Sequence, residues 1–222
     1  DPEDLGRSAF LETRVAACRE ERLSSRRAAT RTLASTPHLF AEIRQPTVDF
    51  VAIPSVVSEN RPFFLASHLS ADVIFNANAT AEDPDGFLFG LISSSMFLAW
   101  LKAVGGRLES RLRFSNTIVW NNFPLPSIST EDRTKVIAAG KGVISARDAY
   151  PSQSLAQLYE PASLPPDLAA AHAALDVVID GLFELVPNKA DEESRQAVLF
   201  REYATLDAGL LAGPSKATRG RR

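Results

Sequence analysis

The segment 86–104, GFLFGLISSSMFLAWLKAV, is the longest apolar run in this chain of 222 residues, and its apolar residues recur at helical spacing. Ser93, Ser94, Ser95 and Lys102 interrupt the run, so it falls short of the roughly 18 apolar residues that span a bilayer. The glycine pair that follows is typical of a helix end. We therefore expect a buried helix in a globular fold, with serines that allow close packing.

The next segment, 107–120, alternates between apolar and charged residues. Leu108, Leu112 and Phe114 fall on the apolar side, and arginines and a glutamate occupy positions between them. This alternation predicts a strand, or a pair of strands, with one face toward the core and a charged face toward solvent.

Short β-branched segments precede the apolar run. Residues 48–53 (VDFVAI) alternate, and residues 63–65 and 73–76 indicate further short strands. Residues 11–33 indicate instead a helix with arginines around its polar face. A basic helix, several short strands and a buried helix together predict an α+β fold.

The second half of the chain has helical patterns. Ser129 with Asp132 forms a capping-box pattern for a helix that ends near residue 150. Core spacing predicts another helix from about residue 167, and Asn188 with Asp191 is expected to cap a last one. The chain is therefore expected to contain three regions: an α+β domain over 1–128, a small helical domain over 129–212 and a disordered tail over 213–222.

The composition excludes several classes of protein. Hydrophobic residues make up 45% and charged residues 23%, which is ordinary for a globular protein. One cysteine, Cys18, excludes an internal disulfide framework and fits a reducing cytoplasm. The three histidines are too far apart for a metal-ligand motif, and no nucleophile elbow or phosphate-binding loop occurs. We expect no catalytic residue, no metal ion and no cofactor in this chain.

The charge distribution is uneven. The net charge is −3, but residues 7–31 contain seven arginines and three glutamates, a local excess of four positive charges. Residues 102–113 contain four basic residues and one glutamate, an excess of three. The planar arginine fork suits bidentate recognition of phosphate or guanine. Solvated surface arginines are the alternative interpretation.

Several short motifs follow one another in a characteristic order. They are Ile53-Pro54, Ser58-Glu59-Asn60-Arg61, Ser94-Ser95-Met96, Trp100, Gly105-Gly106-Arg107-Leu108, Arg113-Phe114-Ser115 and Asn122-Phe123-Pro124-Leu125-Pro126. This series resembles the end of the target recognition domain in MmeI-like restriction–modification enzymes. Leu158-Tyr159-Glu160-Pro161 and Leu164-Pro165-Pro166-Asp167-Leu168 resemble the family's C-terminal helical domain.

The resemblance implies a module that recognises a sequence in double-stranded DNA for a bacterial, cytoplasmic adenine-N6 methyltransferase of type IIG or IIL. The nuclease and methyltransferase regions of the family are missing from this chain. S-adenosylmethionine is therefore expected only in a longer parent enzyme, with Mg²⁺ for a nuclease. The expected partners are DNA and the methyltransferase domain of the same parent, and no membrane. The alternatives are a protein-interaction module that docks through the N-terminal helix and the helical bundle, and an enzyme of another type.

The resemblance assigns base reading to the 109–114 strand and to Asn76 and Ala77. Period-two spacing places Glu109, Arg111 and Arg113 on one strand face. Arginine pairs with guanine, glutamate accepts from cytosine N4 and asparagine pairs with adenine. The alternative is an exposed strand face with an internal ion pair.

Contacts with the DNA backbone are expected from basic residues of the two positive stretches. These residues are Arg14, Arg19, Arg22, Arg26, Arg27, Arg31, Lys102 and Arg107. A solvated helix, or one docked on a missing domain, is the alternative. Met96 and Trp100 are expected in the core, and His172 with Asp176 as a structural hydrogen-bonded pair.

Overall fold

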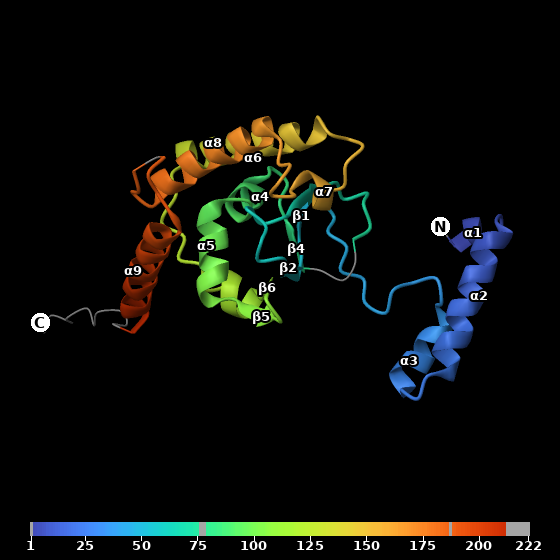
Figure 1. Ribbon diagram of the computed structural model, residues 1–222. Coiled ribbons are helices and arrows are strands. Elements are labelled where there is room, and N and C mark those ends of the chain that lie inside the picture. The colour runs from blue at the N-terminus through green and yellow to red at the C-terminus, as the bar shows by residue number, and fades with distance from the viewer. Residues whose placement is uncertain (1, 76–78, 187, 212–222) are drawn as a thin grey trace, which may run out of the picture. The chain divides into compact units, whose positions relative to one another are not determined.

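A computed structural model describes residues 2–75, 79–186 and 188–211 of the chain (Figure 1). Contacts between residues divide the chain into two compact units, Asp1–Gln45 and Pro46–Arg222. Helices occur together with small antiparallel sheets, so the predicted α+β class is confirmed. The tail expected over 213–222 and the candidate residues Asn76 and Ala77 lie outside the described residues.

The first unit is helical. Its elements are α1 (Pro2–Leu5), α2 (Ala9–Ser24), α3 (Ala28–Thr32) and the 3₁₀ helix η1 (Leu33–Ser35). The single helix expected over 11–33 is wrong, because Ser25 adopts an extended backbone (φ −64°, ψ 140°) and ends α2. Serine is disfavoured in helix interiors, because its hydroxyl competes for backbone hydrogen bonds.

Arg22 connects α2 to residues 33–39 of the first unit. Its guanidinium donates hydrogen bonds to the carbonyl oxygens of Leu33, Thr36 and Leu39 at 2.8, 2.9 and 2.7 Å. Among the described side chains of residues 4–45, only Ala34 is buried. Polar hydrogen bonds, and not an apolar core, therefore define the geometry of the unit.

The second unit contains two three-stranded antiparallel sheets. The first has the order β3 (Ser67–Leu69), β1 (Phe50–Ile53), β4 (Ala79–Glu82). The second has the order β2 (Val56–Val57), β6 (Arg111–Arg113), β5 (Gly106–Leu108). The strand predicted over 48–53 is confirmed as β1, which is buried along its whole length. Side chains of both sheets contribute to one apolar core.

Two expected strands do not form. Residues 63–65 lie outside any strand, and Phe64 is buried with its ring edge-on to Phe97 at a centroid distance of 5.5 Å. Residues 73–75, the described part of the second segment, follow a turn in which Val73 N donates to Ser70 O at 2.9 Å. Apolar composition alone does not distinguish a strand from a packed irregular segment.

The apolar run forms two helices where one was expected. They are α4 (Phe87–Ile92) and α5 (Ser95–Val104), and most of their residues are buried. Ser93 and Ser94 separate them. Ser94 Oγ accepts a hydrogen bond from Phe97 N at 3.2 Å and caps α5. The serines thus end one helix and begin the next, so the run folds back as a compact core.

The remaining helices of the second unit are the π-helix η2 (Asn116–Trp120), α6 (Thr130–Asp148), α7 (Leu155–Leu158), α8 (Pro166–Leu182) and α9 (Glu192–Leu211). The strand pair expected over 107–120 is therefore wrong for residues 116–120, which form η2. α6 and α8 lie side by side, α6 packs on α4, and α9 packs on α5 (Figure 1). These helices share one core with residues 46–127, and the boundary expected at 128/129 stays a prediction.

Two of the predicted helix caps can be compared with the structure. The cap at Ser129 is confirmed, with Asp132 N donating to Ser129 Oγ at 3.0 Å. For the last helix, Asp191 accepts from Ser194 N at 2.8 Å. Asn188 instead adopts a left-handed backbone with φ 61°, so the cap comes from Asp191 and not from both residues.

A buried polar cluster ties the helical cover to the first sheet. Arg147 Nη1 donates to the carbonyl of Ala66 at 2.7 Å, and Arg147 Nε donates to the Tyr159 hydroxyl at 2.6 Å. The same hydroxyl lies 2.7 Å from His172 Nε2. Burial, with the Arg147 charge, lowers the pKa of His172 to about 3, so this imidazole is neutral.

Asp176 lies one turn after His172 on α8 but faces a different element. Its carboxylate accepts from Ser95 N at 2.8 Å and from Ser95 Oγ at 2.5 Å. The hydrogen-bonded pair expected between His172 and Asp176 is therefore wrong, because each side chain has its own partner elsewhere. Asp176 instead ties α8 to the first turn of α5.

α4 and α6 meet through two glycines. A Cβ atom on Gly90 would lie 2.9 Å from Val136 Cγ1 and 3.0 Å from Val136 O. A Cβ atom on Gly140 would lie 3.2 Å from Gly90 Cα. Hydrogen in place of a side chain lets the two backbones touch. Gly142, also on α6, has open space around it.

We expect Gly90→Ala to lower the free energy of unfolding by about 2 kcal/mol, because the added methyl must separate α4 from α6. Gly142→Ala is the matched control, since nothing lies within 4 Å of its added methyl. The control should be neutral or stabilising by up to ~1 kcal/mol, the helix preference of alanine over glycine. Chemical denaturation measures both, and equal effects of the two changes would contradict the contact.

His172 predicts a pH dependence of stability. The unfolded chain takes up a proton at this histidine near pH 6.5, whereas the folded chain does so only at about pH 3. Stability should therefore fall by about 1.4 kcal/mol per pH unit as the pH drops through this window. Urea denaturation between pH 7 and 4 should show a shallower slope for His172→Gln. The exposed His38, changed to glutamine, should keep the slope of the unmodified chain.

Candidate nucleic-acid interface

The second sheet forms a hairpin with a charged outer face. β5 and β6 pair in the register Gly106↔Arg113, Arg107↔Leu112 and Leu108↔Arg111. Leu112 is buried, whereas Arg111 and Arg113 are exposed on the opposite face. The two arginines therefore share one face, as period-two spacing predicts. Leu112 anchors β6 to the core and orients both arginines toward solvent.

Glu109 is not part of this strand face. It is the first residue of the two-residue turn between β5 and β6, and its backbone has φ 58°. Its expected place on the strand with Arg111 and Arg113 is therefore wrong, because the chain reverses between positions 108 and 111. The carboxylate still reaches Arg111, with Oε2 2.7 Å from Nη2. Glutamate rarely adopts the left-handed conformation, whereas glycine and asparagine adopt it readily at hairpin turns.

Glu59 lies beside the same turn, and sequence analysis identifies it only as part of a motif. A hydrogen bond from Ser110, together with the charges of Arg107 and Arg111, holds the pKa of its carboxyl below the usual value. Arg107 Nη1 also donates to the Ser110 carbonyl at 3.1 Å. The turn thus carries two carboxylates and two guanidinium groups within electrostatic reach of one another.

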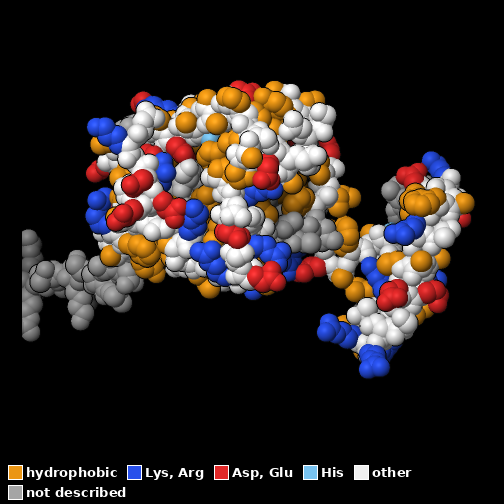
Figure 2. Space-filling model, viewed as in Figure 1, with side chains coloured by type: hydrophobic (Ala, Val, Ile, Leu, Met, Phe, Trp, Pro, Cys, Tyr) orange, Lys and Arg blue, Asp and Glu red, His pale blue; other side chains and the backbone are white. Residues whose placement is uncertain are grey.

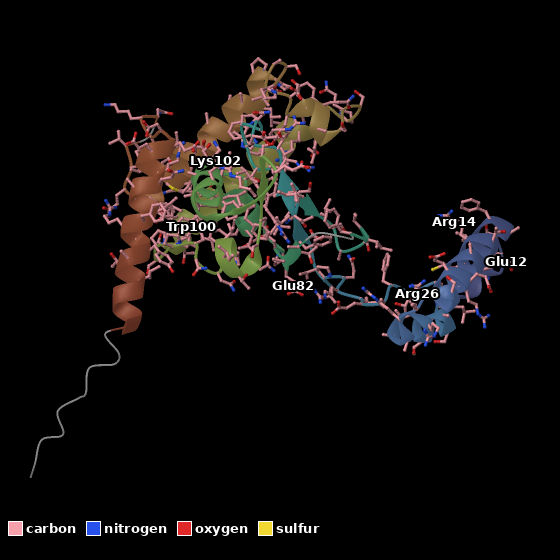
Figure 3. The ribbon with its side chains drawn as sticks, turned by 60° about the horizontal axis from the view of Figure 1, so that its bottom comes forward. Glu12, Arg14, Arg26, Glu82, Trp100 and Lys102 are labelled. Atoms are coloured by element: carbon pink, nitrogen blue, oxygen red, sulfur yellow. The ribbon has the colours of Figure 1, made fainter. Side chains whose placement is uncertain are left out.

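Figure 2 shows Lys and Arg side chains, with acidic ones beside them, over the part of the larger unit where Figure 1 places β5 and β6. Lys102 and Trp100 lie on the adjoining helix α5 (Figure 3). Lys102 Nζ pairs with Glu192 of α9 at 2.5 Å. Trp100 and Met96 are buried, and Trp100 Nε1 donates to Val119 O at 2.8 Å. Their expected place in the core is confirmed.

The arginines of the first unit fall into two groups. Arg22 and Arg31 donate to backbone carbonyls, Arg31 to those of Ser25 and Arg26 at 3.0 Å each. The other group has no ion pair or side-chain hydrogen bond within the described ranges of the chain; its members are Arg14, Arg19, Arg26 and Arg27. Arg14 and Arg26 are labelled in Figure 3. The second group offers charged donors to a ligand, while the first stabilises the unit.

The arrangement is suited to recognition of an anion or a base edge. Across residues 2–75, 79–186 and 188–211, no cluster of three or more His, Cys, Asp or Glu side chains could hold a metal ion. No helix among the described residues is long and apolar enough to cross a membrane. Exposed guanidinium groups in pairs are suited to bidentate hydrogen bonds with phosphate oxygens or guanine.

Comparison with known proteins gives consistent matches. Residues 1–127 match the family model of the MmeI target recognition domain, and residues 128–211 match that of the MmeI C-terminal domain. DNA methyltransferase A of Bacillus subtilis (strain 168) is 30% identical over 205 residues, which are 92% of this chain and 23% of that protein.

A solved structure, the type IIL restriction–modification enzyme MmeI in complex with DNA, is 35% identical to the chain with a TM-score of 0.81. The match covers 94% of this chain and 28% of that one. The chain thus spans about a quarter of the length of these relatives.

Glu109 gives a prediction about the turn itself. We expect Glu109→Gly to be more stable than Glu109→Ala by about 1 kcal/mol, because only glycine adopts the left-handed backbone without strain. Both variants lack the carboxylate that pairs with Arg111, so the lost ion pair cancels in the comparison. Thermal and urea unfolding of the two proteins measure the difference. Equal stability would show that the turn changes conformation when the carboxylate is removed.

Proposed function

The chain belongs to the MmeI family, whose target recognition and C-terminal domains it matches over residues 1–211, and from this premise we propose that it recognises a specific sequence in double-stranded DNA. The observation that carries the proposal is the exposed pair Arg111 and Arg113, held on one face by the buried Leu112. The solved relative in complex with DNA supports this assignment. The major groove admits a two-stranded ribbon, and β5 and β6 form such a pair, with β2 bonded to the other edge of β6.

Base reading is proposed for the outer face of the hairpin and its turn. Arg111 and Arg113 each have two parallel donors for guanine N7 and O6. Glu109 accepts from Arg111 in the free protein, and beside a G·C pair its second oxygen would accept from cytosine N4. Glu109 and Arg111 would thereby read both bases of one pair. Asn76 and Ala77 are proposed as further readers from the resemblance alone.

Backbone contacts are proposed first for the unpaired arginines of the helical unit, Arg14, Arg19, Arg26 and Arg27. Arg22 and Arg31 are weaker candidates, because their guanidinium groups already donate to carbonyls of the chain. Lys102 and Arg107 are also proposed, and Lys102 would have to exchange Glu192 for a phosphate oxygen. Such contacts set the register on DNA and do not select sequence.

We propose further that the chemistry resides in other parts of a longer polypeptide. Adenine-N6 methylation with S-adenosylmethionine, and cleavage with Mg²⁺ where a nuclease is present, would take place there, in the bacterial cytoplasm. The methyltransferase domain is the proposed protein partner of residues 1–45. This unit has one buried residue among its described side chains and exposes Phe10, Phe40 and Ile43, with 72%, 52% and 65% of their surface accessible. Exposed apolar side chains of this kind mark protein contacts.

The specificity of the full-length protein tests the proposal. Arg111→Ala should relax the preference at one base pair by about 1–3 kcal/mol of discrimination. Arg14→Ala should weaken binding to all sequences and reduce the salt dependence by about one unit of slope. Sequencing of methylated sites and binding titrations at several salt concentrations separate the two effects.

Arg201→Ala is the matched control, because Arg201 is exposed on α9 and pairs with its neighbour Glu202. It should change neither the site nor the salt slope. An unchanged recognition site in Arg111→Ala would place the base-reading residues outside this hairpin. If Arg22→Ala binds DNA more weakly while its folding is unchanged, Arg22 also contacts the DNA backbone.

A further inference from the structure

Leu108 lies on the same face of the hairpin as the two arginines. In the register of β5 and β6 it is directly opposite Arg111, and opposed residues of antiparallel strands point to the same side. Its side chain is 46% exposed. The alternation of the sequence suggests the opposite, with Leu108 beside Leu112 in the core. The reversal of the chain at Glu109 and Ser110 accounts for the difference.

An exposed leucine does not by itself indicate a function, because apolar residues are common on protein surfaces. The position of this one is what matters. The other β5 residue on that face is Gly106, opposite Arg113, so Leu108 is the only side chain that β5 adds to the outer face. On β5 and β6 the outer face therefore consists of two bidentate donors and one branched apolar group, and on β2 the half-buried Val56 lies opposite Arg113.

We propose that Leu108 is a further base-reading residue of the hairpin, which contacts the C5-methyl group of a thymine next to the base pair read by Arg111. The proposal rests on the DNA-recognition function inferred above and names a substrate group for it. Opposed Cα atoms in an antiparallel pair lie about 4.5–5.5 Å apart, and successive bases of one strand are spaced about 3.4 Å apart. Leu108 and Arg111 would thus reach the same or adjacent base pairs.

The chemistry of the groove distinguishes this contact from those of the arginines. Thymine presents O4 and a methyl group in the major groove, and only the methyl offers an apolar surface. A guanidinium group cannot recognise that methyl, whereas an aliphatic side chain can. Leu108 would therefore extend the readout from G·C pairs to one A·T pair without any additional hydrogen bond.

Replacement of thymine by uracil tests the contact, because it removes only the methyl group. In duplexes carrying the site found by methylation sequencing, each thymine is replaced in turn and binding of the full-length protein is measured. We expect one position to lose about fourfold in affinity, the equivalent of ~0.8 kcal/mol for one apolar carbon group. In Leu108→Ala this loss should disappear, and in Leu108→Met, which keeps an apolar side chain, it should remain.

Leu206→Ala is the matched control, since Leu206 is 51% exposed on α9 and should leave the uracil effect unchanged. The proposal is overturned if no thymine position is sensitive, or if the sensitive one stays equally sensitive in Leu108→Ala. Where Arg111→Ala nevertheless alters the methylated site, the recognition function stands and only the role of Leu108 fails. Where Arg111→Ala also leaves the methylated site unchanged, the base-reading residues lie outside this hairpin.

Discussion

The contact between Gly90 of α4 and Gly140 of α6 is the constraint on which the rest of the second unit depends. Because these backbones touch, α6 and α8 can cover the apolar run without a gap, and α5 follows from α4 through a two-serine turn. Gly105 ends α5 in a similarly confined place, where a Cβ atom would collide with Leu101 O. Three glycines thus fix where the hairpin β5–β6 emerges from the core, and with it the direction of its arginines.

The sequence predicts those features that depend on local pattern. The buried run, the cap at Ser129 and the shared face of Arg111 and Arg113 all follow from spacing or capping chemistry. Tertiary contacts decide the rest. His172 and Asp176 are one helical turn apart, yet they bond to different elements, because α8 lies between Tyr159 and Ser95. The sequence does not indicate that Glu109 lies in a turn, because the turn contains neither glycine nor asparagine. Charged residues also alternate with others on both sides of the turn, so the pattern reads as one continuous strand.

The first unit shows a second kind of limit. A helix pattern over 11–33 is present, but its serines end α2 at Ser24. The arginines that the pattern places around one polar face divide into carbonyl-bonded and unpaired groups. Composition gives the total charge of a segment, whereas hydrogen-bond geometry decides how much of it a ligand encounters. With one buried residue among its described side chains, the unit gains little from its own apolar contacts. The hydrogen bonds of Arg22 and Arg31 to backbone carbonyls contribute instead.

The two-residue turn of the hairpin constrains how such a chain can diverge. An insertion of one residue in β6 would exchange the two faces of the strand, so that Leu112 became exposed and an arginine entered the core. A buried, unpaired charge would unfold the domain. Insertions and deletions in β6 are therefore strongly destabilising, while single substitutions at its outer positions leave the core intact. With the base-reading role proposed for this face, single substitutions would change the preferred DNA site while the fold is retained.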